Sequence, residues 1–340
     1  MKKLFSFISM FCMSMIVFAQ SSMLATLSHN GEISTFYGAT ALRDAHIAAD
    51  HGDIITLSSG SFTATDIKKA VTIRGAGMSV DTVANTFPTI ITGNFNINIP
   101  DTVNQRLTME GLYHNHDIYV AGTLKNALFL KNRFHNFPYY SPYSRLKNVT
   151  FIHCKVTKTL YLPSESSVSC INCYIKDADS ASPTTSNFEF SNCLIVQEDC
   201  ALNSITSSNY SNCIIYYKGP YTSSNDEIGS SCTAFNCVGK NLAGEDIFKN
   251  LPNTTNKKIE ELNSLFRTYT GSYNDDETFE LTDSAKTQYL GTDGTEVGIY
   301  GGNLPFDPTP TNPQIKKCNV ASKSTADGKL SVDIEVSVAN

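Results

Sequence analysis

Phe151-Ile-His-Cys-Lys-Val156 is followed along the chain by four segments built on the same frame. They are Cys170-Ile-Asn-Cys-Tyr-Ile175, Phe190-Ser-Asn-Cys-Leu-Ile195, Tyr210-Ser-Asn-Cys-Ile-Ile215 and Ala234-Phe-Asn-Cys-Val-Gly239. From one segment to the next, the shared central cysteine recurs after 19, 20, 20 and 24 residues. A period near 20 residues, made of short strands and polar turns, is typical of a solenoid whose units bury apolar surface only against their neighbours.

Within each unit, apolar residues alternate and then skip two positions, as in Phe188, Phe190, Cys193 and Ile195. Alternation predicts a strand, and the skip predicts a bend that redirects the inward face. The same frame continues upstream through residues 126–134 and 107–112 to residues 71–78. We therefore predict an all-β parallel β-helix of about eight coils.

A polar residue precedes each central cysteine. Asparagine in a turn tolerates a left-handed backbone and can hydrogen-bond its own chain. We expect these side chains to form a structural ladder, with stacked asparagines bonded to one another along the axis. The residues are His153, Asn172, Asn192, Asn212 and Asn236.

The ends of the array depart from the repeat. An alanine-rich segment at 39–50 has helical periodicity and is expected to cap the N-terminal coil. The frame loosens over 241–288, where Ile247-Phe248 and a short helix at 257–266 are expected, and excursions of this length often carry function or close an end. We expect a signal peptide at 1–19, a β-helix domain at 20–304, a stiff proline-rich linker at 305–313 and a tail at 314–340 with strands at 315–320 and 330–338.

The first 19 residues combine Lys2 and Lys3 with a short apolar run ending in Ala19, a pattern that predicts an export signal rather than a membrane span. We expect a product without membrane insertion after cleavage, located in the periplasm, at the cell surface or in the medium. The formal net charge is −6, and no basic run is present. These features argue against nucleic acid as a partner.

Two further phrases carry a family resemblance. Gly52-Asp-Ile-Ile-Thr-Leu-Ser-Ser-Gly-Ser-Phe62, placed after the expected helix and followed by Val71-Thr-Ile-Arg-Gly-Ala-Gly77, resembles the N-terminal segment of the pectin lyase-like superfamily. The resemblance is strongest to its exported, largely uncharacterised bacterial branch and runs through Gly294-Thr-Glu-Val-Gly-Ile-Tyr-Gly-Gly302. It implies a right-handed parallel β-helix and specifies no reaction.

Nine of the ten cysteines follow the expected signal peptide. The spacing Cys170-x-x-Cys173 suits zinc or a redox pair, but both residues fall in apolar columns of the repeat. We expect the column cysteines to be free, buried thiols that behave as small hydrophobic residues. Disulfides and a metal site stay as alternatives, with Cys200, Cys232 and Cys318 as the better bridge candidates because they lie outside the column.

One group of polar and aromatic residues is expected on a lateral face, where consecutive coils meet. Tyrosines offer flat surfaces to sugar rings, while Arg and His can bond hydroxyls or carboxylates. The alternative is a solvated turn region whose tyrosines only cover the core. The candidate polysaccharide-binding residues are His114, His116, Asp117, Arg133, His135, Tyr139, Tyr140, Tyr143 and Arg145.

No catalytic motif is matched. Polysaccharide lyases of the superfamily that the chain resembles use acidic side chains to hold calcium and an Arg or Lys to take the proton, but here Asp117 stands almost alone on the candidate face. A hydrolase needs two carboxylates on neighbouring coils, for which the pairs Asp177 with Asp179 and Glu198 with Asp199 are candidates. A weak calcium candidate is formed by Asp275, Asp276 and Glu277, for which a solvated acidic loop is the favoured interpretation. No other cofactor is expected.

The sequence thus predicts an exported β-helix protein that binds a polysaccharide along its lateral face, with a lyase or hydrolase reaction left open. The alternative is a non-catalytic structural or adhesive surface protein that uses the β-helix as a rigid scaffold. A cleft with converging acidic or basic side chains would favour the first function, and a uniform polar flank would favour the second.

Overall fold

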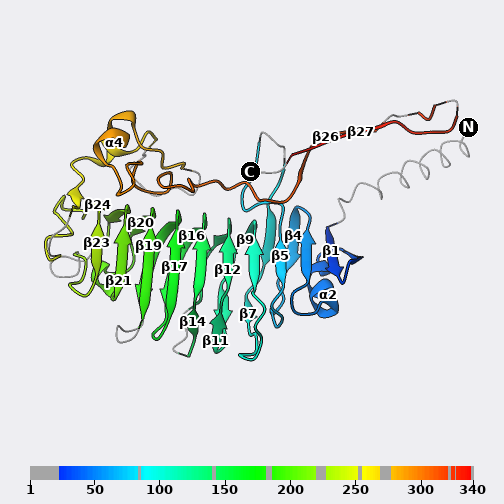
Figure 1. Cartoon of the computed structure of the whole chain (residues 1–340), viewed down its shortest axis with the longest axis horizontal. Helices are drawn as coiled ribbons and strands as arrows, with labels where there is room; N and C mark the ends of the chain where they lie inside the picture. Colours follow the sequence, from blue (N-terminus) through cyan, green and yellow to red (C-terminus); the bar gives the residue numbers. More distant parts are fainter. Residues whose placement is uncertain are drawn as a thin grey trace, which may run out of the picture.

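The structure is a computed structural model that describes residues 23–82, 86–139, 143–180, 186–219, 227–251, 255–268, 277–320, 323–325 and 327–337. The expected signal peptide lies outside these residues. The chain forms a parallel β-solenoid of about nine turns, one more than expected (Figure 1). The predicted all-β parallel β-helix is therefore confirmed.

Each coil contributes a strand to two long parallel sheets. The coil strands of the first sheet are β3 (Ile54–Leu57), β5 (Thr72–Arg74), β8 (Thr108–Glu110), β12 (Leu128–Leu130), β15 (Val149–Ile152), β17 (Ser167–Ile171), β19 (Asn187–Ser191), β21 (Ser208–Ser211) and β23 (Thr233–Phe235). The second sheet contains β4 (Gly60–Thr63), β6 (Thr89–Thr92), β9 (Leu112–His114), β13 (Arg133–Phe134), β16 (Lys155–Leu162), β18 (Tyr174–Ser180), β20 (Leu194–Gln197), β22 (Ile214–Tyr217), β24 (Val238–Lys240) and β25 (Lys257–Lys258).

The third side of the coils carries shorter parallel pairs. The strand β7 (Phe95–Ile97) pairs with β10 (Ile118–Val120), and β11 (Thr123–Lys125) pairs with β14 (Arg145–Lys147). The longer strands β16 and β18 extend from the second sheet onto this side, where Tyr161 pairs with Asp179.

Inward-facing side chains stack in register from coil to coil. The rings of Phe129 and Phe151 lie 5.0 Å apart, and those of Phe190 and Tyr210 lie 5.1 Å apart. Cys170 occupies the position between Phe151 and Phe190, as the sequence predicts. These columns form one continuous apolar core along the axis.

The bend between the two long sheets is set by a column of residues with positive φ. Most are asparagine, which tolerates this region better than other non-glycine residues. Their φ values lie between 48° and 66°. The column consists of Gly111, Lys131, His153, Asn172, Asn192, Asn212 and Asn236.

In the five coils where a cysteine follows the left-handed residue, the thiol lies at a position that can pair backbone groups of the bend. Sγ of Cys213 accepts the N–H of Cys193 at 3.4 Å and donates to the carbonyl of Phe190 at 3.3 Å. Asn132 occupies the same position nearer the N-terminus, where it accepts the N–H of Leu112 and donates to the carbonyl of Met109. The thiols therefore replace a carboxamide in pairing the backbone groups of the bend.

All cysteines with described side chains are free, including the bridge candidates Cys200 and Cys232. The side chain of Cys318 lies outside the description. Burial raises the pKa of the Cys154 and Cys193 thiols well above the usual value. The column cysteines are therefore free thiols that lie buried in the core.

The N-terminal end is closed by a helix and a hairpin. The helix α2 (Ala41–Ala48) buries Ala41, Leu42 and Ala45, which confirms the expected cap. The hairpin of β1 (Leu24–His29) and β2 (Glu32–Tyr37), which the sequence analysis did not predict, adds antiparallel strands to the first sheet beside β3.

The C-terminal end is closed by the excursion after β24. Ile247 and Phe248 of this excursion are buried against the inner core. The short helix η2 (Leu202–Ser204) is a separate feature that lies on an earlier coil. The helix expected at 257–266 is wrong in extent: only α3 (Leu262–Leu265) is helical, because Lys257–Lys258 continues the second sheet as β25. A further helix, α4, spans Asp283–Gln288.

A second apolar cluster lies on the outer face of the second sheet. Tyr174 of β18 stacks on Phe279 at 5.1 Å, and Leu194 and Ile214 lie in the same cluster. Residues of the excursion, including Phe266, cover these side chains. This cover explains why all four residues of β20 and all four of β22 are buried.

After α4 the chain runs back along the coils as a strap, defined here as residues 289–312 (Figure 1). It crosses the column of left-handed bend residues from the C-terminal end toward the N-terminal end. Side chains of the bend column bond backbone carbonyls of the strap: Asn236 bonds Leu290, Asn172 bonds Ile299 and Gly301, and His153 bonds Leu304. Near the end of the strap the direction is reversed, and the Asn312 side chain bonds the carbonyl of Gly75.

The strap corrects two expectations. Asn172, Asn192 and Asn212 are buried and Asn236 is half-buried, but Asn172, Asn212 and Asn236 direct their side chains to the strap rather than to one another. Most of the proline-rich segment expected as a linker is bonded to the coils. Lys131 donates to Asp307 at 3.0 Å and to the carbonyl of Thr309, and buried Glu110 accepts the N–H of Thr311 at 2.7 Å.

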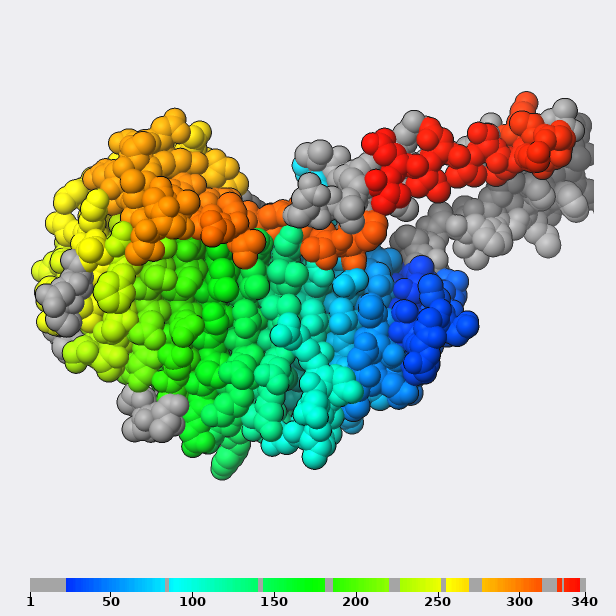
Figure 2. Space-filling view, in the orientation of Figure 1, coloured from blue at the N-terminus to red at the C-terminus, as the bar shows by residue number. Residues whose placement is uncertain are grey.

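Beyond the strap, β26 (Gln314–Val320) and β27 (Val332–Ser337) form an antiparallel hairpin. This agrees with the two strands expected in the tail. Figures 1 and 2 show the hairpin projecting away from the coils.

The ion pair between Lys131 and Asp307 generates a pH-dependent prediction. Burial opposes ionisation of Asp307, but the N–H of Thr309 and the Lys131 ammonium outweigh it and hold the Asp307 pKa below its usual value of 3.8. The folded state therefore binds this proton less tightly than the unfolded state, so the stabilisation is present above pH 3.8 and is lost as the pH falls through the folded pKa. We expect Asp307→Asn to lower the free energy of unfolding at pH 7 by about 1 kcal/mol.

Denaturant unfolding at pH 7 and at successively lower pH measures this difference, which should shrink toward zero in acid. The control is Asp101→Asn, which removes an exposed pair with Lys125 and should cost no more than about 0.5 kcal/mol. Equal effects of the two substitutions would contradict the assignment of the strap contact.

Candidate functional site

The structure brings together Asp117, Arg133, His135 and Tyr139 on adjoining sides of the middle coils. Arg133 belongs to β13, and the other three lie at or just beyond the turn that leads from the second sheet to the third side. His116 is exposed in the same turn as Asp117. This group is called the lateral face below.

Asp117 fixes the position of His135 across two coils. One carboxylate oxygen lies 2.9 Å from Nδ1 of His135 and accepts a bond of 2.8 Å from Asn136. The His135 side chain is 44% exposed and that of Asp117 is 20% exposed. The arrangement holds an imidazole at the surface, where it can bond a hydroxyl or a carboxylate of a ligand.

A cationic row lies beside this pair on the outer face of the second sheet. Tyr113, Arg133 and Lys155 are register partners on three successive coils. The Arg133 guanidinium lies 4.5 Å from the centre of the Tyr113 ring, and the Lys155 ammonium lies 5.8 Å from that of Phe306. The strap residue Phe306 therefore borders the lateral face at its C-terminal side.

A tyrosine column runs along the third side of the coils. The ring of Tyr139 lies 5.2 Å from that of Tyr119 and 6.4 Å from that of Tyr161. The register extends the column to Asn96, the partner of Tyr119, and to Asp179, the partner of Tyr161. The sequence analysis missed Tyr119 and Tyr161, although each sits between two inward apolar residues, as Ile118-Tyr-Val120 and Leu160-Tyr-Leu162.

The other predicted site residues lie elsewhere. His114 is buried in the core, 5.0 Å from the Phe134 ring and nearly parallel to it, and burial lowers its pKa to about 3. Arg145 belongs to β14 and pairs with Glu165 at 3.5 Å, and Tyr143 is highly exposed in the loop before it. Tyr140 lies outside the described residues.

The carboxylates considered for a hydrolase have structural partners. Asp177 is fully buried, and one of its oxygens accepts the N–H groups of Glu198, Asp199 and Cys200. Burial raises the Asp177 pKa to about 6 despite these bonds. Glu198 lies between Lys176 at 3.2 Å and Lys218 at 3.4 Å. This arrangement ties one coil to the next.

Within the part of the chain that the structure describes, no cluster of three His, Cys, Asp or Glu side chains is arranged to hold a metal ion. Asp275 and Asp276 of the calcium candidate lie outside that part, whereas Glu277 is buried.

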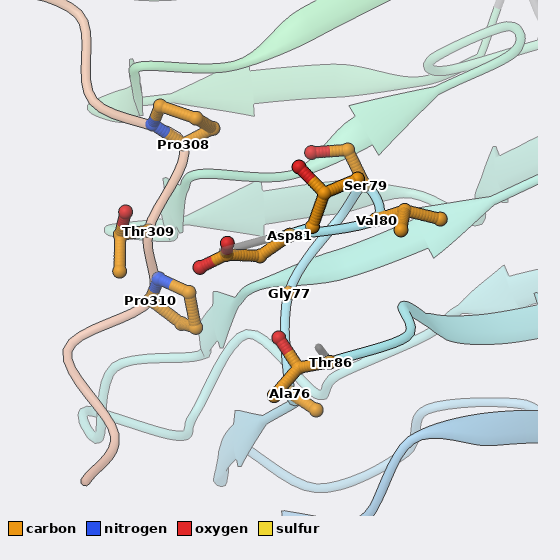
Figure 3. A pocket seen from close by; sticks show the side chains of 10 residues that line it. Ala76, Gly77, Ser79, Val80, Asp81, Thr86, Pro308, Thr309 and Pro310 are labelled. Atoms are coloured by element: carbon orange, nitrogen blue, oxygen red, sulfur yellow. The ribbon is translucent and has the colours of Figure 1, made fainter. Parts of the chain in front are cut away.

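A separate hollow of about 380 Å³ lies where the strap meets the loop after β5. Figure 3 shows Asp81 reaching from this loop toward Thr309, with Pro308 and Pro310 on the strap side. None of the polysaccharide-binding, hydrolase or calcium candidates predicted from the sequence lines this hollow.

Comparisons with known proteins give no match: no family model, curated protein or solved structure matches the chain. Among the helices of the described residues, none has the length and apolar composition needed to span a bilayer. The lateral face must therefore be interpreted from its own chemistry.

The burial of His114 generates a prediction. Its folded-state pKa of about 3 lies below the unfolded value near 6.5, so the unfolded state binds the proton more tightly and stability falls as the pH drops from 6.5 toward 3. His114→Phe keeps the stacked ring and removes this penalty. As the pH falls from 7.5 to 5, the free energy of unfolding of the variant should rise by about 2 kcal/mol relative to that of the native chain.

Urea unfolding at the two pH values measures the gain. His116→Phe, which changes an exposed histidine two residues further along the chain, is the control for a histidine-to-phenylalanine change outside the core. A pH-independent effect of His114→Phe would show that the imidazole is not held neutral in the core.

Proposed function

We propose that the protein is an exported member of the right-handed, pectin lyase-like group of β-helices and that it binds a polysaccharide along the lateral face. The tyrosine column carries this proposal. Its rings follow one another from coil to coil along the third side, so an extended polymer lying along the solenoid axis meets a new ring at each coil.

Stacking on tyrosine supplies apolar contact with the faces of sugar rings, and the neighbouring polar groups supply orientation. His135, held by Asp117, lies next to the column, and Arg133 stands one strand away. Arg133 and Lys155 favour a glycan that carries carboxylate or sulfate groups, because a guanidinium and an ammonium form charge-assisted hydrogen bonds with such groups. The expected ligand is an acidic or mixed polysaccharide rather than a short neutral sugar.

The chemistry of the face supports binding more strongly than bond cleavage. A glycoside hydrolase needs two carboxyl groups about 5–9.5 Å apart on either side of the scissile bond. On the lateral face Asp117 is engaged by His135 and Asn136, and Asp179 lies at the far end of the tyrosine column. Binding without cleavage is therefore the favoured function of the lateral face.

A second candidate function, a structural or adhesive scaffold, is favoured by the projecting C-terminal hairpin. It predicts that removal of the tyrosine rings leaves the behaviour of the protein unchanged. The two functions therefore differ in a measurable property of the same side chains.

The prediction concerns Tyr119→Ala combined with Tyr139→Ala. Loss of two adjacent stacking surfaces should weaken polysaccharide binding about tenfold or more, since each ring contributes about 1 kcal/mol or more. Affinity electrophoresis against a panel of acidic and neutral polysaccharides measures retention, and ultraviolet absorbance of unsaturated ends tests for lyase activity. The melting temperature establishes that the variant is folded.

Tyr37→Ala, which removes an exposed tyrosine from β2 at the N-terminal hairpin, is the matched control and should leave retention unchanged. Absence of retention of the native protein across the panel would contradict the proposal and favour the scaffold. Equal losses in both variants would show that the binding is not made by the tyrosine column.

A further inference from the structure

The C-terminal hairpin exposes an apolar face that no other described part of the chain covers. Leu330, Val332, Ile334 and Val336 are each 51 to 54% exposed. Figure 2 shows the hairpin standing clear of the coils on the side from which the strap emerges. Its base is fixed, because Asn312 bonds the carbonyl of Gly75 two residues before β26 begins.

The register places apolar and charged residues on opposite faces. Val332, Ile334 and Val336 alternate along β27 with Asp333 and Glu335. The backbone partners of the three apolar residues are Val320, Cys318 and Ile315 of β26. The register therefore sets three apolar pairs at alternate positions, with Lys317 opposite Glu335 and Asn319 opposite Asp333 between them, while Lys316 lies at an irregularity of the register.

A two-stranded hairpin of this kind is not a complete structural unit. Independent stability in water requires at least a third strand or a second layer over the apolar face. Among the described residues, no further strand lies beside either outer edge of this two-stranded sheet, and such edges are templates for another strand. The hairpin therefore needs a partner that covers its apolar face, just as each solenoid coil needs its neighbouring coils to bury its apolar side chains.

The charges of the two strands identify the partner. β27 carries Asp333 and Glu335 and no basic residue, whereas β26 carries Lys316 and Lys317 and no acidic residue. Two β27 edges side by side would oppose acids, and two β26 edges would oppose lysines. Only β26 beside β27 sets opposite charges across the new pair.

We propose that the occupant is a second copy of this chain, with the β26 edge of one copy paired to the β27 edge of the next. The contact is head-to-tail, so each copy keeps one free edge and the sheet can extend. Closure of the extended sheet on itself buries the apolar faces inside and leaves the charged faces in water. The hairpin is then an assembly element that holds several solenoids together through their strap ends.

The test uses the full mature chain in sedimentation velocity over a range of concentrations. One variant combines Asp333→Lys with Glu335→Lys, and the other combines Lys316→Glu with Lys317→Glu. The native chain should self-associate, and each variant alone should bind itself at least about tenfold more weakly, because every new edge contact opposes like charges. An equimolar mixture of the two variants should associate again.

Restoration in the mixture would show that opposite charges on the paired edges hold the copies together, and the self-association of the native chain selects β26 beside β27, the only native pairing that sets opposite charges across the contact. Lys323→Glu, in the connection between the strands, is the control for a charge change outside the paired edges and should associate like the native chain. Ile334→Asp should abolish association while the melting temperature of the solenoid stays unchanged, which separates assembly from folding.

A native chain that stays monomeric at all concentrations would overturn the proposal. So would self-association of either variant at native strength, or failure of the mixture to associate. Association that appears only with a glycan or lipid vesicle would identify a different occupant and would equally overturn it.

Discussion

The hydrogen bond between the backbone of one coil and the bend side chain of the next coil is the constraint on which the fold depends. At the bend, the strand ladders of the two long sheets are interrupted, and the N–H of Cys193 has its partner in Sγ of Cys213. The N–H of Cys213 in turn has its partner in Sγ of Cys237. An unpaired buried N–H would cost about 1–3 kcal/mol at each coil, so the small polar side chain repeats with the coil.

The bend also determines what lies on the outside of the solenoid. A left-handed residue before the cysteine directs its side chain outward, and the strap is bonded to this row of side chains. A solenoid normally has contacts only between neighbouring coils, so its stability is a sum of local terms. Here the bond between Glu110 and Thr311 joins residues 201 positions apart. The strap therefore couples distant coils and positions the C-terminal hairpin.

The coils, the N-terminal helix and the tail strands were predictable because each is encoded by local periodicity. The strap was not, because its residues 289–312 have no period and owe their position to partners such as Lys131 and Asn172. The same difference applies to the lateral face. Arg133 and His135 could be placed from the repeat, but Tyr119 and Tyr161 become neighbours of Tyr139 only when the third side of each coil is aligned. His114 was misplaced as a surface residue because its inward position, two residues after Leu112, was not weighed against its polarity.

The central claim is that the column cysteines act as hydrogen-bonding groups and not only as small apolar residues. Chemical denaturation of Cys213→Ser and Cys213→Ala tests it most directly, because both side chains are smaller than cysteine and only serine can donate and accept. The account predicts that the serine variant unfolds with a free energy close to that of the native chain and that the alanine variant loses about 1–3 kcal/mol more. An alanine variant as stable as the serine variant, or more stable, would contradict it.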